Sequence, residues 1–161
     1  MFVFKKRLLF PKHYPIPGSN QVLEFTSPVL RVFNKYQQAN GHLEAGGLLF
    51  AKFNLPKIIV KEATLPHELD NRSRYGFFPC KEVQQKIILK RFSSGLHFIG
   101  EWHTHPEEFP NPSSIDIFSM SDSFNKSKHE LNYFVMVIVG SNAGDISLCV
   151  SLHNGSEFIK I

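Results

Sequence analysis

The sequence predicts an α/β (α+β) sandwich, in which a mixed β-sheet is flanked by about three helices. Three helical segments are interleaved with strand-like apolar runs along the chain. One run, residues 132–140 (NYFVMVIVG), is apolar almost without interruption, which is typical of a strand covered on both faces. Helices that alternate with such strands pack as layers on the sheet.

The first helix is expected over residues 26–41. Ser27 is placed to cap it, Pro28 suits its first turn, and Gly41 marks its end. Its apolar stripe, with spacings i, i+3, i+4 and i+7, consists of Val29, Val32, Phe33 and Tyr36.

The remaining helices follow later in the chain. The second is expected over residues 80–95, where Gly95 follows its end. Its candidates for burial are Val83, Ile87 and Phe92. The third is expected over residues 113–128, with Ser113 as its N-cap and Asp116 completing a variant of the capping box.

Strands are expected on either side of these helices. Their ranges are residues 21–25, 44–53, 57–66, 97–106, 132–140, 146–153 and 156–161. Residues 54–56 form the turn between two of them, and residues 141–145 (SNAGD) form a hairpin turn. Residues 67–79 are expected to be a polar loop that carries exposed aromatic side chains.

The composition favours one domain over residues 1–161. The chain is 42% hydrophobic and 20% charged, as in an ordinary soluble globular protein. Its net charge of +4 is mild and forms no continuous basic stripe, which argues against a nucleic-acid partner. Cys80 and Cys149 suit reduced thiols in a cytoplasm. Neither a signal peptide nor a membrane span is expected.

The candidate metal-binding residues concentrate in residues 100–116 (GEWHTHPEEFPNPSSID). On an extended strand, His103 and His105 project from the same face and can share one cation. The proline-rich return brings Asp116 back toward the two imidazoles. These residues would form a His-His-Asp zinc site whose fourth position is left for water, the open arrangement that hydrolysis requires.

A plainer interpretation competes with this one. A His-Xaa-His pair on a strand is often surface decoration, and short motifs have high false-positive rates. Ser113 and Asp116 also make sense as a helix cap alone. The combined pattern of His-Xaa-His, seven residues, Ser, two residues and Asp favours the metal site.

Hydrolysis at such a site also needs a proton shuttle. Glu44 is preferred, and the adjacent Gly46 and Gly47 allow neighbouring backbone to pack closely beside it. Glu101 is a rival base, because it shares the strand face of His103. The base must reach the attacking water at hydrogen-bond distance.

These five positions carry a family resemblance. Glu44, His103, His105, Ser113 and Asp116 match the JAMM motif of the JAB/MPN metalloproteases, whose fold is similar to that of the cytidine deaminases. The resemblance covers about residues 22–150. It implies one Zn²⁺ per chain on His103, His105 and Asp116. It also implies that Glu44 is the general base and that Ser113 donates to the oxyanion, a role that competes with capping.

Within that family, the chain resembles compact prokaryotic isopeptidases found in CBASS antiphage operons. These lie beside homologues of ubiquitin-activating and ubiquitin-conjugating enzymes. The resemblance implies a zinc isopeptidase or peptidase that cuts at the extended C-terminal tail of a ubiquitin-like protein or a conjugated nucleotidyltransferase. In many relatives an aromatic residue stands where this chain has Glu101, so the role of Glu101 is open.

The tail could add as a strand beside an exposed sheet edge, near residues 70–78. Candidate substrate contacts there are Arg72, Arg74, Tyr75 and Phe77; the alternative is a loop that tucks its aromatics into the core. Two other functions remain open, a non-catalytic MPN-type scaffold and a nucleic-acid-associated DNA-repair protein. A deaminase is excluded because His-Thr-His replaces His-Xaa-Glu and the second cysteine of Pro-Cys-Xaa-Xaa-Cys is missing.

Overall fold

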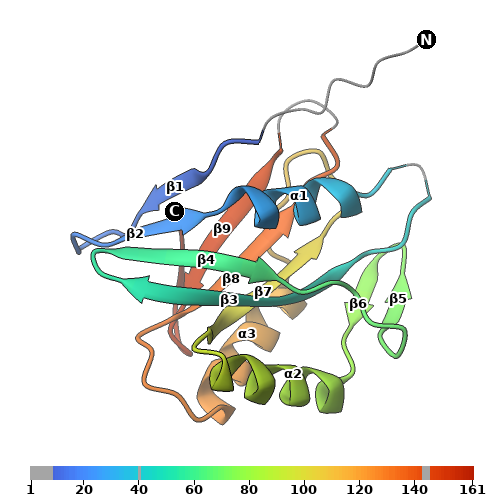
Figure 1. The fold of residues 1–161 in the computed structure, drawn as a ribbon. Helices are drawn as coiled ribbons and strands as arrows, with labels where there is room; N and C mark the ends of the chain where they lie inside the picture. The colour runs from blue at the N-terminus through green and yellow to red at the C-terminus, as the bar shows by residue number, and fades with distance from the viewer. Residues whose placement is uncertain (1–8, 40, 143–145) are drawn as a thin grey trace.

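The computed structural model describes residues 9–39, 41–142 and 146–161 (Figure 1). The expected hairpin turn at residues 141–145 lies partly outside these ranges. In chain order the elements are β1 (Lys12–Pro15), β2 (Val22–Phe25), α1 (Ser27–Tyr36), β3 (Gly46–Asn54), β4 (Lys57–Ala63), β5 (Asn71–Ser73), β6 (Gly76–Phe78), α2 (Lys81–Ser93), β7 (His97–Thr104), α3 (Ser114–Lys126), β8 (Phe134–Val139), β9 (Leu148–His153) and β10 (Phe158–Lys160).

Eight of these strands form one mixed sheet, which confirms the predicted fold class. Their order is β1-β2-β4-β3-β7-β8-β9-β10, while β5 and β6 form a separate two-stranded sheet. Neighbours pair antiparallel except β2 with β4 and β7 with β8, which are parallel. Strand β7, which carries the histidine motif, therefore lies in the middle of the sheet, between β3 and β8.

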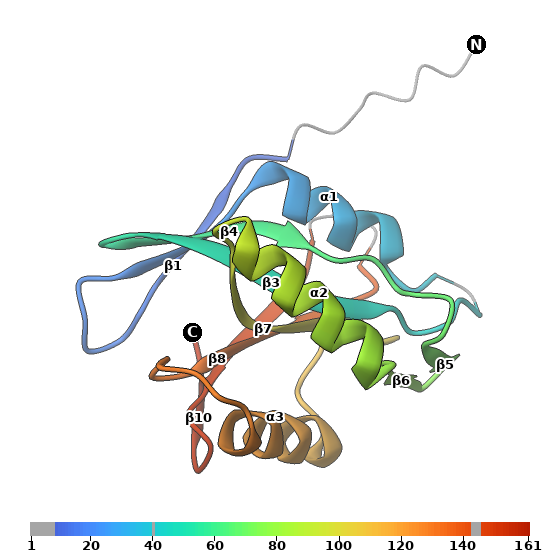
Figure 2. The same cartoon turned by 60° about the horizontal axis from the view of Figure 1, so that its bottom comes forward.

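Helices cover both faces of the sheet, α1 one face and α3 the other (Figure 2). Strand β8 packs against both layers of helices, and all six of its residues are buried. Val135, Val137 and Val139 belong to the core cluster that contains the buried residues of α1. The intervening Phe134, Met136 and Ile138 pack with Met120 of α3. This alternation confirms the prediction of a strand covered on both faces.

Strand β7 has the same alternation. Trp102 faces α1, where its ring centroid lies 5.3 Å from that of Phe33. Glu101 and His103, on the opposite face, line a cleft on the α3 side. The expectation that Glu101 and His103 share one strand face is therefore confirmed.

The predicted limits of α1 were wrong at both ends. Thr26, not Ser27, is the N-cap; it makes no side-chain cap bond, and its hydroxyl donates to the Val60 carbonyl. The helix ends at Tyr36, five residues before Gly41, because the Gln37 side chain bonds the carbonyls of Gly140 and Asn142.

Helix α2 has no fully buried residue: Val83 and Ile87 are half-buried, and the predicted burial of Phe92 was wrong. Phe92 is 67% exposed and contacts the ring of His97 edge-on, at 5.9 Å between centroids. The helix contacts the sheet at β7 without being enclosed by a further layer. The predicted Gly95 after its end is confirmed, with φ +78°.

Two other predictions need correction. The expected loop at residues 67–79 contains the hairpin of β5 and β6, in which Arg72 pairs with Phe77. Strand β1 was not predicted because prolines surround it, yet it pairs with β2 along the sheet edge. Among the described residues, none of the helices combines the length and apolar character that a membrane crossing requires.

Candidate metal centre and cleft

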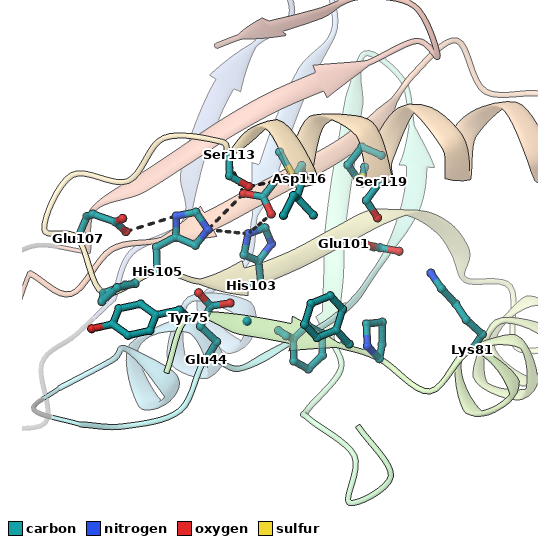
Figure 3. A pocket seen from close by; sticks show the side chains of 18 residues that line it. Glu44, Tyr75, Lys81, Glu101, His103, His105, Glu107, Ser113, Asp116 and Ser119 are labelled. Atoms are coloured by element: carbon teal, nitrogen blue, oxygen red, sulfur yellow. Dashed lines mark hydrogen bonds and ion pairs between the residues drawn. The ribbon is translucent and has the colours of Figure 1, made fainter. Parts of the chain in front are cut away.

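A cleft of about 450 Å³ opens where β7, α3 and the β5–β6 hairpin meet (Figure 3). This volume lies within the range of small-molecule and peptide sites. The side chains around it include all five residues of the predicted motif: Glu44, His103, His105, Ser113 and Asp116. Residues separated by up to 72 positions in the sequence (116 − 44) thus line one cavity.

His103, His105 and Asp116 bring two imidazole nitrogens and the two oxygens of one carboxylate together. The two Nε2 atoms lie 3.1 Å apart. Asp116 Oδ1 is 3.3 Å from His103 Nε2, and Asp116 Oδ2 is 3.2 Å from His105 Nε2. These three residues form the one cluster of metal-binding type within the described part of the chain.

These separations fit a zinc ion. An ion held tetrahedrally at about 2.0 to 2.1 Å from each ligand keeps its ligand atoms about 3.3 Å apart. The distances of 3.1, 3.3 and 3.2 Å are close to that edge length. Two imidazoles and one carboxylate are also a donor set that suits zinc. The residues present therefore fit the metal that the motif implies.

Backbone structure fixes each ligand. His103 lies within β7, and the His105 N–H donates to the Val139 carbonyl at 3.0 Å, one step past the strand end. Asp116 is set by a reciprocal capping box, in which Ser113 N–H donates to Asp116 Oδ2 at 2.8 Å and Asp116 N–H donates to Ser113 Oγ at 3.1 Å. The predicted cap at Ser113 is confirmed.

The electrostatics of the cluster favour positive charge between these groups. Burial acts to raise the pKa of Asp116, but hydrogen bonds from His103 and His105 hold it far below its usual range. Burial acts to lower the pKa of His105, yet the Asp116 carboxylate raises it overall. A field that stabilises protonated imidazole also stabilises a bound cation at the same place.

Glu44 stands beside the cluster, just before β3. It is 6% exposed, and burial raises its pKa, while the charges of His103 and His105 act to lower it. The first residue of β3, Gly46, pairs with His103 of β7. An added Cβ at Gly46 would lie 2.6 Å from the Phe77 ring and the Trp102 carbonyl, so the close packing expected at this glycine is present.

Glu101 lines the same cleft, on the other side of His103 (Figure 3). Burial raises its pKa, and the nearby Lys81 and His103 act to lower it. Glu44 interacts electrostatically with all three members of the metal cluster, whereas Glu101 interacts with His103 alone. The geometry thus brings Glu44, more than Glu101, to the cluster.

Two residues on the core face of β7, Trp102 and Thr104, hold the strand in place and so align the proposed ligands. Trp102 Nε1 donates to the Thr64 carbonyl at 3.0 Å. Thr104 is fully buried, and its hydroxyl accepts the Ala45 N–H at 3.0 Å and lies 3.2 Å from Gln38 Oε1. The bond from Ala45 to Thr104 fixes β7 to the segment that carries Glu44, and the Trp102 bond fixes β7 to the segment after β4.

The four candidate substrate contacts divide into two pairs. Tyr75, which is 75% exposed, and Phe77 line the cleft. The Arg72 guanidinium instead donates to the Glu44 carbonyl at 2.6 Å. The Arg74 guanidinium lies 5.7 Å from the centroid of the Tyr75 ring. Substrate contact by these residues stays a prediction.

The sequence did not reveal the partner of the second ring nitrogen of His105. Glu107 Oε2 lies 3.4 Å from His105 Nδ1, an arrangement that directs Nε2 toward the metal cluster. The available signal was weak, because Glu107 is one of two adjacent glutamates in a proline-rich loop.

The family follows from comparison with known proteins. A sequence model described as prokaryotic homologs of the JAB domain matches residues 26–151. The chain belongs to this family. The predicted recognition is thereby confirmed, and the matched range contains the whole metal cluster and Glu44.

Similar proteins carry a common name. A Pseudomonas aeruginosa protein named CD-NTase/cGAS isopeptidase is 32% identical over 156 residues, which cover 94% of this chain and 98% of that protein. An Escherichia coli protein of the same name is 34% identical over 105 residues, covering 62% and 66%. A solved structure from Desulfitobacterium hafniense, with 17% identity, covers 85% of this chain and 88% of its own with a TM-score of 0.62, which supports the fold alone.

Proposed function

We propose that this protein is a zinc-dependent isopeptidase of the JAMM type. It hydrolyses an amide bond at the C-terminal tail of a conjugated or precursor protein, within CBASS antiphage defence in the cytoplasm. The observation that carries the proposal is the cluster of two imidazole Nε2 atoms, 3.1 Å apart, that lie 3.3 and 3.2 Å from the two oxygens of the Asp116 carboxylate, beside the buried carboxyl group of Glu44. The names of the relatives support an isopeptidase with a nucleotidyltransferase-type substrate.

His103, His105 and Asp116 would hold one zinc ion per chain. When bound, the ion supplies Lewis acidity that brings the pKa of water toward about 7 and polarises the scissile carbonyl. Glu44 takes the proton of the attacking water and delivers it to the leaving amine. Because burial raises its pKa, Glu44 is a stronger base than an exposed carboxylate.

Ser113 donates its hydroxyl proton to the oxyanion of the tetrahedral intermediate. Its cap does not compete with this role, because capping uses Oγ as the acceptor of the Asp116 N–H. A hydroxyl has one donor proton and two acceptor lone pairs, so the donor remains available. Such a donor contributes about 3 to 4 kcal/mol to transition-state stabilisation in comparable sites.

The substrate tail lies extended along the cleft beside β6. This strand pairs with β5 on one side, while Tyr75 and Phe77 line the cleft. An extended tail can add to the free edge through main-chain hydrogen bonds. The tail belongs to a ubiquitin-like protein or a conjugated nucleotidyltransferase, and homologues of ubiquitin-activating and ubiquitin-conjugating enzymes form the conjugate.

Glu44→Gln provides the test, because it keeps the shape of the side chain and removes the base. The zinc-loaded protein is incubated with a conjugate of a CD-NTase joined through its C-terminus to a lysine. Wild type is expected to release the free tail, and Glu44→Gln to lose at least about 10²-fold in rate with full zinc content. Glu68→Gln, at a residue that does not line the cleft, is the control.

Two results would count against the proposal. Wild type that binds zinc and the conjugate without cleaving it would indicate the scaffold function instead. Undiminished turnover by Glu44→Gln would assign the base to another group, with Glu101→Gln as the next variant to measure.

A further inference from the structure

The carbonyl of Glu44 has a charged partner outside the cleft. Arg72 Nε donates to this carbonyl at 2.6 Å, and the Glu44 N–H donates to the Ser73 carbonyl at 2.7 Å. Both partners belong to β5. The peptide groups on either side of the Glu44 Cα are therefore held by adjacent residues of one strand.

The side chain of Arg72 is directed away from the cleft. It is absent from the residues that line the cleft and instead borders a second cavity with Tyr36, Gln37 and His42. A direct contact with substrate in the cleft would require the guanidinium to leave the Glu44 carbonyl. The bond is also charge-assisted, which makes it about twice as strong as a neutral one.

Glu44 needs such support because it precedes the regular sheet. The pairing of β3 with β7 begins at Gly46. On the β7 side, Ala45 exchanges hydrogen bonds with Thr104, from its N–H to the Thr104 hydroxyl and from the Thr104 N–H to its carbonyl. The peptide group between Glu44 and Ala45 is therefore held by Thr104 through its N–H and by Arg72 through its carbonyl, while the peptide group before Glu44 is held by β5.

We propose that Arg72 is a positioning residue that ties the β5–β6 hairpin to the general base. Its bond to the Glu44 carbonyl fixes the peptide group that follows the Glu44 Cα, and so the direction in which the carboxylate enters the cleft. The hairpin that supplies Tyr75 and Phe77 to the cleft then also sets the base. This inference rests on the proposed role of Glu44.

The position of the Glu44 carboxylate matters because the rate of proton transfer depends steeply on geometry. A displacement of about 1 Å in a catalytic group can cost about 10²-fold in rate. Loss of Arg72 is therefore expected to lower kcat by about 10- to 100-fold. KM should stay within about twofold, since the guanidinium does not line the cleft.

The first test measures hydrogen–deuterium exchange in the full zinc-loaded chain, without substrate. Arg72→Ala is expected to speed exchange of the Glu44 and Ala45 amides by at least about fivefold, and Arg72→Lys by less. Arg74→Ala, on the same hairpin, is the control and should match wild type, because the Arg74 guanidinium lies over Tyr75. Unchanged exchange in Arg72→Ala, or equal acceleration in Arg74→Ala, would overturn the inference.

The second test measures kcat and KM for a linear fusion of a CD-NTase tail to a fluorescent protein. Arg72→Ala should lower kcat with KM unchanged, Arg72→Lys should recover part of the loss, and Arg31→Ala on α1 serves as control. Zinc content and thermal midpoint are measured in parallel to exclude unfolding. A raised KM with normal kcat would make Arg72 a substrate contact and refute the inference. If wild type itself cleaves neither this fusion nor the isopeptide conjugate, the proposed function fails, while the exchange experiment still decides the role of Arg72.

Discussion

Asp116 combines two tasks through its two carboxylate oxygens. Oδ2 accepts the Ser113 N–H at 2.8 Å and lies 3.2 Å from His105, while Oδ1 lies 3.3 Å from His103. The cap at the start of α3 therefore sets the orientation of the proposed ligand. The residue that caps this helix is thus also the proposed metal ligand.

Substitutions of Asp116 can separate its role in the helix cap from its proposed role as a metal ligand. Asp116→Asn keeps an acceptor for the Ser113 N–H but loses the anionic ligand, so zinc content should fall well below one per chain while stability changes little. Asp116→Ala should lose both zinc and about 1 kcal/mol of unfolding free energy. Elemental analysis and urea unfolding measure the two effects, with Asp122→Asn on the exposed face of α3 as control. Stoichiometric zinc in both Asp116 variants would refute the ligand role.

Substitutions of Ser113 can likewise separate its role as a helix cap from its proposed role as a donor to the oxyanion. Ser113→Ala should lower the single-turnover rate by about 10²- to 10³-fold and stability by about 1 kcal/mol, with zinc retained. Ser113→Thr keeps a hydroxyl and should recover part of both. If Ser113→Ala cleaves at the wild-type rate, the serine serves only as a cap.

Among the strands, the start of β3 has the tightest packing near the proposed base. An added Cβ at Gly46 would lie 2.6 Å from both the Phe77 ring and the Trp102 carbonyl oxygen. The carbonyl belongs to the central strand β7 and cannot move freely. Gly46 therefore permits β3, β7 and the hairpin to converge beside Glu44.

Gly46→Ala is expected to destabilise the protein by about 1 to 3 kcal/mol, because overpacking forces the backbone or the Phe77 ring to shift. Lys52→Ala, at the exposed end of β3, should change stability by less than about 0.5 kcal/mol. Thermal unfolding of both variants, followed by circular dichroism, measures the difference. Equal stability of Gly46→Ala and wild type would show that the hairpin can shift without loss of unfolding free energy.

The elements that the sequence predicted well are those with strong local signals. The continuous apolar run predicted β8, and the serine and aspartate of a capping box predicted the start of α3. The elements that it predicted poorly depend on distant partners. Gln37 ends α1 by bonding residues about 100 positions away, and α2 remains exposed because no further layer encloses it.

The candidate site was more predictable than the architecture around it. His103 and His105 project together because a strand alternates its side chains, a rule that needs no tertiary information. The tie from Arg72 to Glu44 was not predictable, because it depends on a hairpin with strands of only three residues and a sequence typical of a loop. The parallel pairs β2–β4 and β7–β8 likewise follow from the global topology.

The buried core of the molecule contains an imidazole that should make stability depend on pH. His153 is 1% exposed and lies 2.8 Å from the Ser151 hydroxyl. Burial lowers the pKa of His153 to about 4. Between its unfolded pKa of about 6.5 and about 4, the unfolded chain binds a proton that the native protein does not.

Stability is therefore expected to fall as the pH falls through this window, by at most about 3 kcal/mol from His153, and to be fully present above about pH 6.5. His153→Gln should weaken this dependence, whereas His42→Gln removes an exposed histidine and should not. Urea unfolding of metal-free protein at pH 7 and pH 4.5 gives the comparison. A wild type and a His153→Gln variant with the same pH dependence would contradict this assignment.

Helix α3 is fastened to the turn between β9 and β10, where the Ser121 hydroxyl and the Asn125 amide both donate to the Gly155 carbonyl. The carboxylate at the start of this helix thus depends on strands that follow all three proposed ligands in the sequence. A nascent chain that has emerged only as far as residue 126 would carry both imidazoles, but its acidic partner would not yet be docked. The arrangement of the three proposed ligands is therefore expected to form only after residues 148–160 have been made and have docked on α3.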